Sequence, residues 1–157
     1  MTRQGLAALG LLLTGVICNA SVIPYMSVYI VETLGKEPWM ISLYATVTLT
    51  LTLLVNRQYG EWIDAGTPIA PLVLASVAAF AAAIISILVV PNFWVLVCFA
   101  SPCIAVSNAA VSTMYSFGRL LAERENLNIA RYNSYLRAMT SLGWMLAPAA
   151  SFYIASI

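Results

Sequence analysis

The amino-acid sequence predicts an all-α membrane protein with five transmembrane helices. Of the 157 residues, 62% are hydrophobic and only 8% are charged, whereas about a quarter of an ordinary soluble domain is charged. Several apolar stretches reach or approach the ~20 residues that a helix needs to cross the hydrocarbon layer. The longest uniform stretch lacks the alternation that marks the strands of a β-barrel. We expect one helical bundle over residues 1–157, with spans at 5–29, 39–56, 68–90, 93–115 and 132–157.

The first expected span carries Asn19 near its middle and Pro24 slightly more than one turn later. Proline removes a backbone donor and bends a helix, which membrane helices tolerate where neighbours satisfy the freed carbonyl. The apolar run continues past Asn19 for longer than the hydrophobic region of a signal peptide. We therefore interpret it as an uncleaved span.

The second expected span carries threonine at four alternate positions. On a helix these residues form two i,i+4 pairs on different faces, Thr46 with Thr50 and Thr48 with Thr52. Hydroxyl side chains in membrane helices bind to neighbouring helices. We expect at least one pair to contact another helix, with contact to a substrate as the alternative.

The third and fourth expected spans differ in polarity. The third is apolar on all sides, which suits a position facing lipid. The two-residue turn Pro91–Asn92 makes the third and fourth spans antiparallel neighbours. In the fourth span, Asn108, Ser112 and Ser116 recur at i,i+4 and form a polar stripe. Polar groups at membrane depth mark helix contacts or transport pathways, and both interpretations stay open for this stripe.

The distribution of basic residues predicts the orientation of the chain. If the five spans alternate, one side receives Arg3, Arg57, Arg119, Arg124, Arg131 and Arg137, and the other receives only Lys36. Basic residues collect on the cytoplasmic side of membrane proteins. The N-terminus is therefore expected in the cytoplasm.

The sequence offers no group suited to enzymatic chemistry. It contains no histidine, its carboxylates lie in the expected loops, and it has no glycine-rich phosphate loop. We therefore expect no catalysis, no cofactor and no metal site. The basic residues are too dispersed to bind nucleic acid. Three cysteines inside the expected spans, Cys18, Cys98 and Cys103, are interpreted as small core residues and not as a disulfide framework.

Three segments together resemble a known transporter family. They are "IPYMSVYIVETLGKEPWMISLY" at 23–44, "AVSNAAVSTMYSFGRLLAE" at 105–123 and "YLRAMTSLGWMLAPAASF" at 135–152. With the order of spans and loops, they resemble the N-terminal half of a major facilitator superfamily transporter, and within it the bacterial sugar efflux transporters. The resemblance implies a multi-pass protein of the bacterial inner membrane that exports sugars by alternating access, coupled to protons.

Two shorter motifs are carried over from the same resemblance. "GEWIDAG" is similar to the family's loop between the second and third spans, with Gly60 at the turn and Asp64 before the next helix, but the basic residues that usually follow are missing. The alternative for Asp64 is a helix N-cap before Pro68. "GWMLAP" resembles the antiporter motif of exporting members, whose matching positions are Gly143, Ala147, Pro148 and Ser151, with Ala147 where the family commonly has Gly.

The antiporter-like motif also has a physical interpretation of its own. Small residues at i, i+4 and i+8, namely Gly143, Ala147 and Ser151, leave a groove in which another helix can approach closely. Pro148 frees a backbone carbonyl one turn earlier and bends the helix. This pattern suits a helix that moves against a neighbour.

Four residues are predicted to bind the substrate. Asn19 and Asn108 lie near the middle of the membrane, and an amide offers both a donor and an acceptor to a sugar. Arg137 could donate to sugar hydroxyls, with anchoring at the membrane interface as its alternative. Trp144 offers an indole face on which a sugar can stack.

The family plan has two halves of six spans, with the substrate bound between them. Five expected spans leave this plan incomplete, so the expected partners are the lipid bilayer, a sugar-like solute, protons, and a missing C-terminal half or partner chain. Two alternatives remain open. One is a drug-exporting relative, and the other is a truncated, non-transporting membrane protein or accessory subunit.

Overall fold

The computed structural model describes residues 3–124 and 128–155, and within these ranges it is helical without strands. Two π-helical turns accompany the α-helices: η1 continues α1, and η2 joins α4 to α5. In chain order the elements are α1 (Arg3–Val28), η1 (Tyr29–Thr33), α2 (Trp39–Asp64), α3 (Ile69–Val89), α4 (Phe93–Val95), η2 (Leu96–Ala100), α5 (Ser101–Arg124) and α6 (Ile129–Ala155).

Four helical stretches are long and apolar enough to cross a membrane: Gly5–Thr33, Trp39–Asp64, Ile69–Val89 and Phe93–Glu123. The prediction of an all-α membrane protein is confirmed. Residues 132–155 of the fifth expected span, 132–157, lie in α6, whose 27 residues are long enough to cross, and the last two residues of that span lie outside the described part. Its first half carries arginines and other polar side chains, and α6 is not among these four stretches. It stays a predicted span.

The second helix continues well beyond its expected end and corrects the prediction of a loop there. Gly60 and Asp64 lie in the last turns of α2, not in a connecting loop. The alternative that Asp64 caps the next helix is also wrong, because Pro68 occupies the N-cap position of α3. An exposed i,i+4 ion pair between Arg57 and Glu61, 2.9 Å apart, supports the added turns.

The end of α2 is set by Gly66. This residue has a φ of 86°, a left-handed conformation that glycine adopts without steric cost. Its amide donates to the Ile63 carbonyl at 3.0 Å, and the Thr67 amide donates to the Trp62 carbonyl at 2.9 Å. These two hydrogen bonds form a Schellman motif, which satisfies the last carbonyls of α2.

The described residues form two compact units. The central unit covers Tyr25–Ala110, and the terminal unit combines Met1–Pro24 with Val111–Ile157. The boundaries fall within α1 and α5, so each of these two helices contributes to both units.

The core of the central unit lies where α2, α3 and α5 meet. Tyr59, Leu72 and Ala109 are buried together there, one from each helix. Beside them Ser76 is 1% exposed, and its Oγ lies 3.0 Å from the carbonyl oxygens of both Leu72 and Val106, so its one hydroxyl hydrogen is shared between them. The buried stripe of α3 therefore includes a hydroxyl that binds the backbone of α5.

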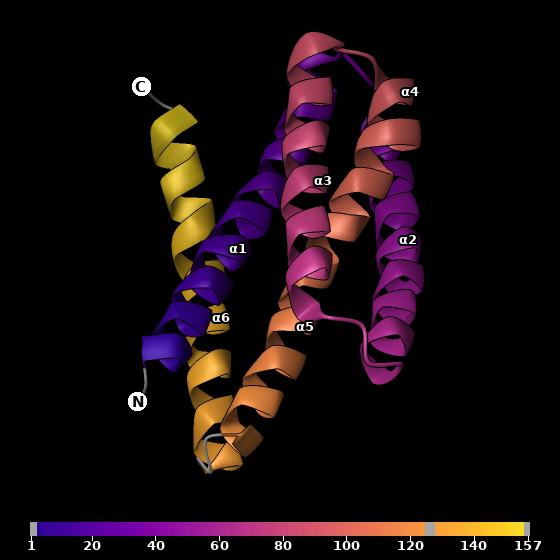
Figure 1. Cartoon of the computed structure of the whole chain (residues 1–157). Coiled ribbons are helices and arrows are strands. Elements are labelled where there is room, and N and C mark those ends of the chain that lie inside the picture. The colour runs from indigo at the N-terminus through magenta and orange to yellow at the C-terminus, as the bar shows by residue number, and fades with distance from the viewer. Residues whose placement is uncertain (1–2, 125–127, 156–157) are drawn as a thin grey trace. The chain divides into compact units, whose positions relative to one another are not determined.

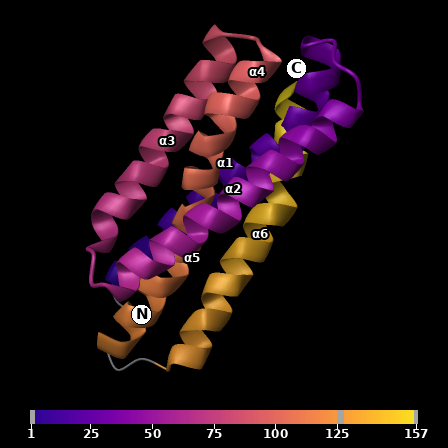
Figure 2. The same cartoon turned by 90° about the vertical axis from the view of Figure 1, so that its right-hand side faces the viewer.

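The antiparallel arrangement of the third and fourth spans is observed in the structure. Figures 1 and 2 both show α3 and α4 side by side, joined by a short turn. Asn92 begins α4, since its Oδ1 accepts a hydrogen bond from the Trp94 amide at 2.8 Å. The Tyr29 hydroxyl donates to the Ile87 carbonyl at 3.1 Å and ties η1 to the end of α3.

Of the two threonine pairs, the one formed by Thr48 and Thr52 contacts another helix. Thr48 Oγ1 donates to Ser101 Oγ at 3.1 Å, and Ser101 Oγ donates to the Leu96 carbonyl at 3.1 Å. Thr50 instead donates to the Thr46 carbonyl of its own helix at 2.8 Å, and both residues of this pair are exposed. The expectation that at least one pair contacts another helix is confirmed for Thr48 and Thr52.

Replacing Thr48 by valine should destabilise the protein, because the isosteric side chain keeps the volume but loses the hydrogen bond to Ser101. The expected loss in the free energy of unfolding is about 0.6 kcal/mol, the average for interhelical hydrogen bonds in membrane proteins. Unfolding by sodium dodecyl sulfate, followed by circular dichroism, measures it. Thr46→Val is the matched control and should change little, because Thr46 is exposed on the same helix. Equal effects of both variants would contradict this account.

Candidate functional site

The small residues of α6 form a contact with α1 inside the terminal unit. A Cβ atom at Gly143 would lie 2.5 Å from Val16 Cγ1 and 3.0 Å from Val16 Cβ, so only glycine permits this approach. Ala147 is completely buried. One turn further, Ser151 Oγ lies 3.4 Å from the Ser21 carbonyl and donates at 2.9 Å to the carbonyl of Ala147. The groove predicted from the sequence is therefore occupied by α1, whereas its role in conformational change stays a prediction.

Pro148 lies inside α6, as expected from the sequence. Because proline has no backbone N–H, α6 lacks one of its internal hydrogen bonds at this point. The groove residues Gly143, Ala147 and Ser151 lie on either side of this weakened turn. The bend expected at Pro148 stays a prediction.

The two asparagines occupy different environments. Asn19 is 7% exposed, and its Nδ2 donates to the Gly15 carbonyl of its own helix at 3.0 Å. Asn108, in the central unit, points its Nδ2 toward Thr52 Oγ1 at 3.4 Å. That contact supports the alternative of interhelical hydrogen bonding for Asn108, and substrate binding by either amide stays a prediction.

Arg137 lies in a polar pocket between α5 and α6. The pocket has a volume of about 280 Å³ and is lined by Tyr115, Ser116, Arg119, Asn133 and Arg137, all in the terminal unit. Its lining therefore offers two guanidinium groups, one amide and two hydroxyls. Trp144 is not among these lining residues and is 49% exposed, so the structure does not bring all four predicted substrate residues together in one pocket.

The pocket is held in place by a close contact between the two helices. A Cβ atom at Gly118 would lie 2.6 Å from Leu136 Cδ1 and 2.9 Å from Tyr132 Cε1. One turn away, the hydroxyls of Tyr115 and Thr140 are 2.8 Å apart. These contacts fix the register of the helix pair, in which Arg119 and Arg137 both line the pocket.

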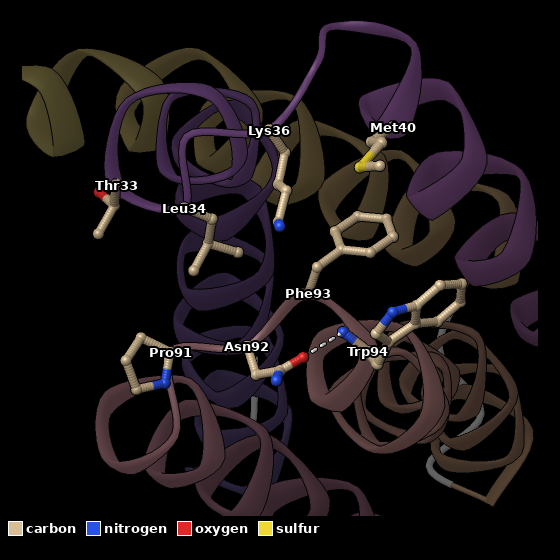
Figure 3. Close-up of a pocket in the computed structure, with 8 residues that line it drawn as sticks. All are labelled: Thr33, Leu34, Lys36, Met40, Pro91, Asn92, Phe93 and Trp94. Carbon is tan, nitrogen blue, oxygen red and sulfur yellow. Dashed lines mark hydrogen bonds between the residues drawn. The ribbon is translucent and has the colours of Figure 1, made fainter.

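A second pocket lies at one end of the central unit and contains none of the predicted site residues. It has a volume of about 350 Å³ and lies between the loop after η1 and the turn before α4. Figure 3 shows the Lys36 side chain extending between Leu34 and the ring of Phe93, with Trp94 on the far side of that ring. The described residues contain no cluster of three or more His, Cys, Asp or Glu side chains that could hold a metal ion.

Comparison with known proteins found one informative similarity. Over 126 residues, the chain is 28% identical to a protein of Deinococcus radiodurans named "Putative sugar efflux transporter". The match covers 80% of this chain but only 32% of the relative, so the chain spans about a third of that protein's length. No protein-family model matches the chain. No solved structure matches it either.

Several residues of these contacts were not predicted from the sequence. Val16 is an ordinary apolar residue, and Ser21 takes part through its backbone carbonyl, so neither side chain marks a partner of the α6 groove. Gly118 did carry a signal, since glycine inside a membrane helix often marks a close approach of two helices. Arg119 was interpreted only through its charge, because its place opposite Arg137 depends on the register of two helices.

Replacing Gly143 by alanine should destabilise the contact between α1 and α6, because Val16 is β-branched and has little rotamer freedom in a helix. We expect a loss of about 1–3 kcal/mol in the free energy of unfolding, the usual cost of overpacking. Unfolding in detergent measures the loss. Gly10→Ala in α1 is the matched control, because no atom lies within 4 Å of its added Cβ.

A compensating change tests whether Val16 is the cause. The double variant Val16→Ala/Gly143→Ala should be more stable than the sum of the two single effects predicts. Distant, independent substitutions add to within about 0.5 kcal/mol. Additivity within that limit would show that Val16 and Gly143 are not coupled.

Proposed function

We propose that the chain is part of a membrane transporter that exports sugars or related small solutes. The observation that carries this proposal is the similarity over 126 residues to the D. radiodurans protein named as a sugar efflux transporter. It supports a transporter role, and the four apolar helical stretches support a position in the membrane. The finer assignment to the major facilitator superfamily rests on the three resembling segments at 23–44, 105–123 and 135–152.

The proposed mechanism is alternating access. It is supported by the contact between α1 and α6, where Gly143, Ala147 and Ser151 let two helices approach closely. A contact made of small residues leaves a smooth surface on which one helix can pivot. Pro148 removes one backbone hydrogen bond from the same part of α6 and lowers the resistance of the helix to bending.

The proposed substrate contacts are made by Asn19, Asn108, Arg137 and Trp144. The support is strongest for Arg137, because it lines a polar pocket of about 280 Å³ together with an amide and two hydroxyls. Sugar recognition requires several hydrogen-bond groups in one place. Trp144 is half-exposed on the same helix and offers an indole face to a ligand.

The proposal includes a bacterial inner-membrane location with a cytoplasmic N-terminus, which the one-sided placement of six of the seven basic residues supports. It also includes coupling to protons, as the resemblance implies. Because the chain spans about a third of the D. radiodurans relative, we propose that a further segment or a partner chain completes the transport path.

Sugar efflux from bacterial cells tests the proposal. The chain is produced alone, and also joined to the remainder of the D. radiodurans relative in place of the matching third. Cells preloaded with a radiolabelled sugar analogue should lose it several-fold faster when they contain the joined protein than when they contain an empty vector. Arg137→Gln and Asn19→Ala should slow this efflux severalfold at unchanged protein level. The exposed Gln58→Ala serves as the control and should leave the rate unchanged.

Three outcomes would contradict the proposal. Export of a fluorescent dye but not of sugar would indicate a drug exporter. If the intact relative exports sugar but the joined protein exports neither the sugar nor the dye, the chain does not support transport. Unchanged efflux in both variants would remove Arg137 and Asn19 from the substrate site.

A further inference from the structure

The pocket between α5 and α6 brings two arginines together without a matching number of carboxylates. Its five lining residues include Arg119 and Arg137 and no acidic residue. The described carboxylate nearest in sequence, Glu123, binds Arg119 Nε at 3.0 Å. Among the described residues, the pocket and its ion-pair partner therefore hold two guanidinium charges and one carboxylate, an excess of one positive charge.

Arg137 makes no hydrogen bond or ion pair with any other residue that the structure describes. Its guanidinium group therefore keeps its five N–H donors available at the pocket. Arg119 uses only Nε for Glu123, so its terminal nitrogens are available as well. Two like charges at one small site repel each other unless an anion lies between them.

The remaining lining residues complete a set of donors. Asn133 contributes an amide N–H₂ group and Ser116 a hydroxyl. The Tyr115 hydroxyl adds no donor to this set, because its hydrogen is already used in the contact with Thr140. Thr140 Oγ1 donates to the Leu136 carbonyl at 3.0 Å, so the Tyr115 hydroxyl must be the donor in its 2.8 Å contact with Thr140. Tyr115 therefore forms a wall of the pocket and fixes the spacing of the two helices.

We propose that this pocket binds a phosphate group. Arginine pairs bidentately with phosphate oxygens, and charge-assisted hydrogen bonds of this kind are the strong ones. Two guanidinium forks, an amide and a hydroxyl supply more donors than the two oxygens of a carboxylate can accept, and they suit the three or four oxygens of a phosphate. The volume of about 280 Å³ lies just below the range of ~300–1,000 Å³ for sites of drug-sized ligands, which fits a head group or a small phosphate ester.

Two sources could provide this phosphate, a lipid head group and a soluble phosphate ester. The arginines lie in the parts of α5 and α6 nearest the segment that joins them, where a membrane helix meets the lipid head groups. Both sources present the same phosphate chemistry, so the binding experiment needs one arm for each. The proposal does not depend on the transport function, because it is tested by binding alone.

Binding is measured on the full 157-residue chain, purified in a neutral detergent. In the first arm, native mass spectrometry compares phosphatidylglycerol with the zwitterionic phosphatidylcholine. In the second arm, isothermal titration calorimetry measures inorganic phosphate and glycerol phosphate. The variants are Arg119→Gln/Arg137→Gln and the conservative Arg119→Lys/Arg137→Lys. Circular dichroism confirms that each variant keeps its helix content.

The structure offers a closely matched control in Arg57→Gln. Arg57 and Glu61 form the same i,i+4 pair at 2.9 Å, with side-chain exposures of 81% and 54%, against 71% and 43% for Arg119 and Glu123. Arg57, however, does not line the pocket. If removal of any exposed arginine weakens binding, Arg57→Gln and Arg119→Gln/Arg137→Gln should both bind the probes less tightly. If the pocket is the binding site, only Arg119→Gln/Arg137→Gln should lose binding.

The wild-type chain should bind at least one of the anionic probes, which are phosphatidylglycerol, inorganic phosphate and glycerol phosphate, at least tenfold more tightly than phosphatidylcholine, whose phosphate is balanced by its own choline cation. The double glutamine variant should lose that preference. The lysine variant should fall between them, because it keeps the charges but loses the planar forks. Preference for phosphatidylglycerol alone identifies a head-group site, and binding of the soluble phosphates alone or of both identifies a site open to solutes. Binding no tighter than that of phosphatidylcholine, or an equal loss in Arg57→Gln, would overturn the proposal.

Discussion

In a lipid environment, burial of apolar side chains does not by itself drive helices together, because the lipid tails are equally apolar. Backbone polar groups must be satisfied within each helix, and contacts between helices depend on close packing and on a few hydrogen bonds. The described part of this protein follows that constraint, since none of its buried side-chain nitrogen or oxygen atoms lacks a hydrogen bond. Ser76, Thr48 and Gly143 therefore help to specify where the helices contact one another.

The apolar composition and the length of the apolar stretches predicted the helices, because both depend directly on whether lipid or water surrounds the chain. The end of α2 was missed because Gly60 was given the role of a turn, whereas the hydrogen bonds place the turn at Gly66. A glycine within a helix and a glycine that ends one look alike in the sequence. The ion pair between Arg57 and Glu61 at i,i+4 was the available signal that the helix continues.

The candidate site was predictable only where it depends on a single helix. The spacing of Gly143, Ala147 and Ser151 defines a face of α6, so the groove could be found from the sequence. Its partner Val16 could not, because the pairing depends on how α1 and α6 cross. The same limit applies to Arg119 and Arg137, which share a pocket only because Gly118 and Tyr115 set the register of α5 against α6.

We expect the helices, α6 included, to lie in lipid and to pack through small and hydroxyl residues. Hydrogen–deuterium exchange of the chain in lipid nanodiscs tests it most directly. We expect slow exchange of the backbone amides in the middle of α1, α2, α3, α5 and α6, and fast exchange at Gly35 and Glu37 in the turn before α2. Exchange in α6 as fast as at these two turn residues would contradict this expectation.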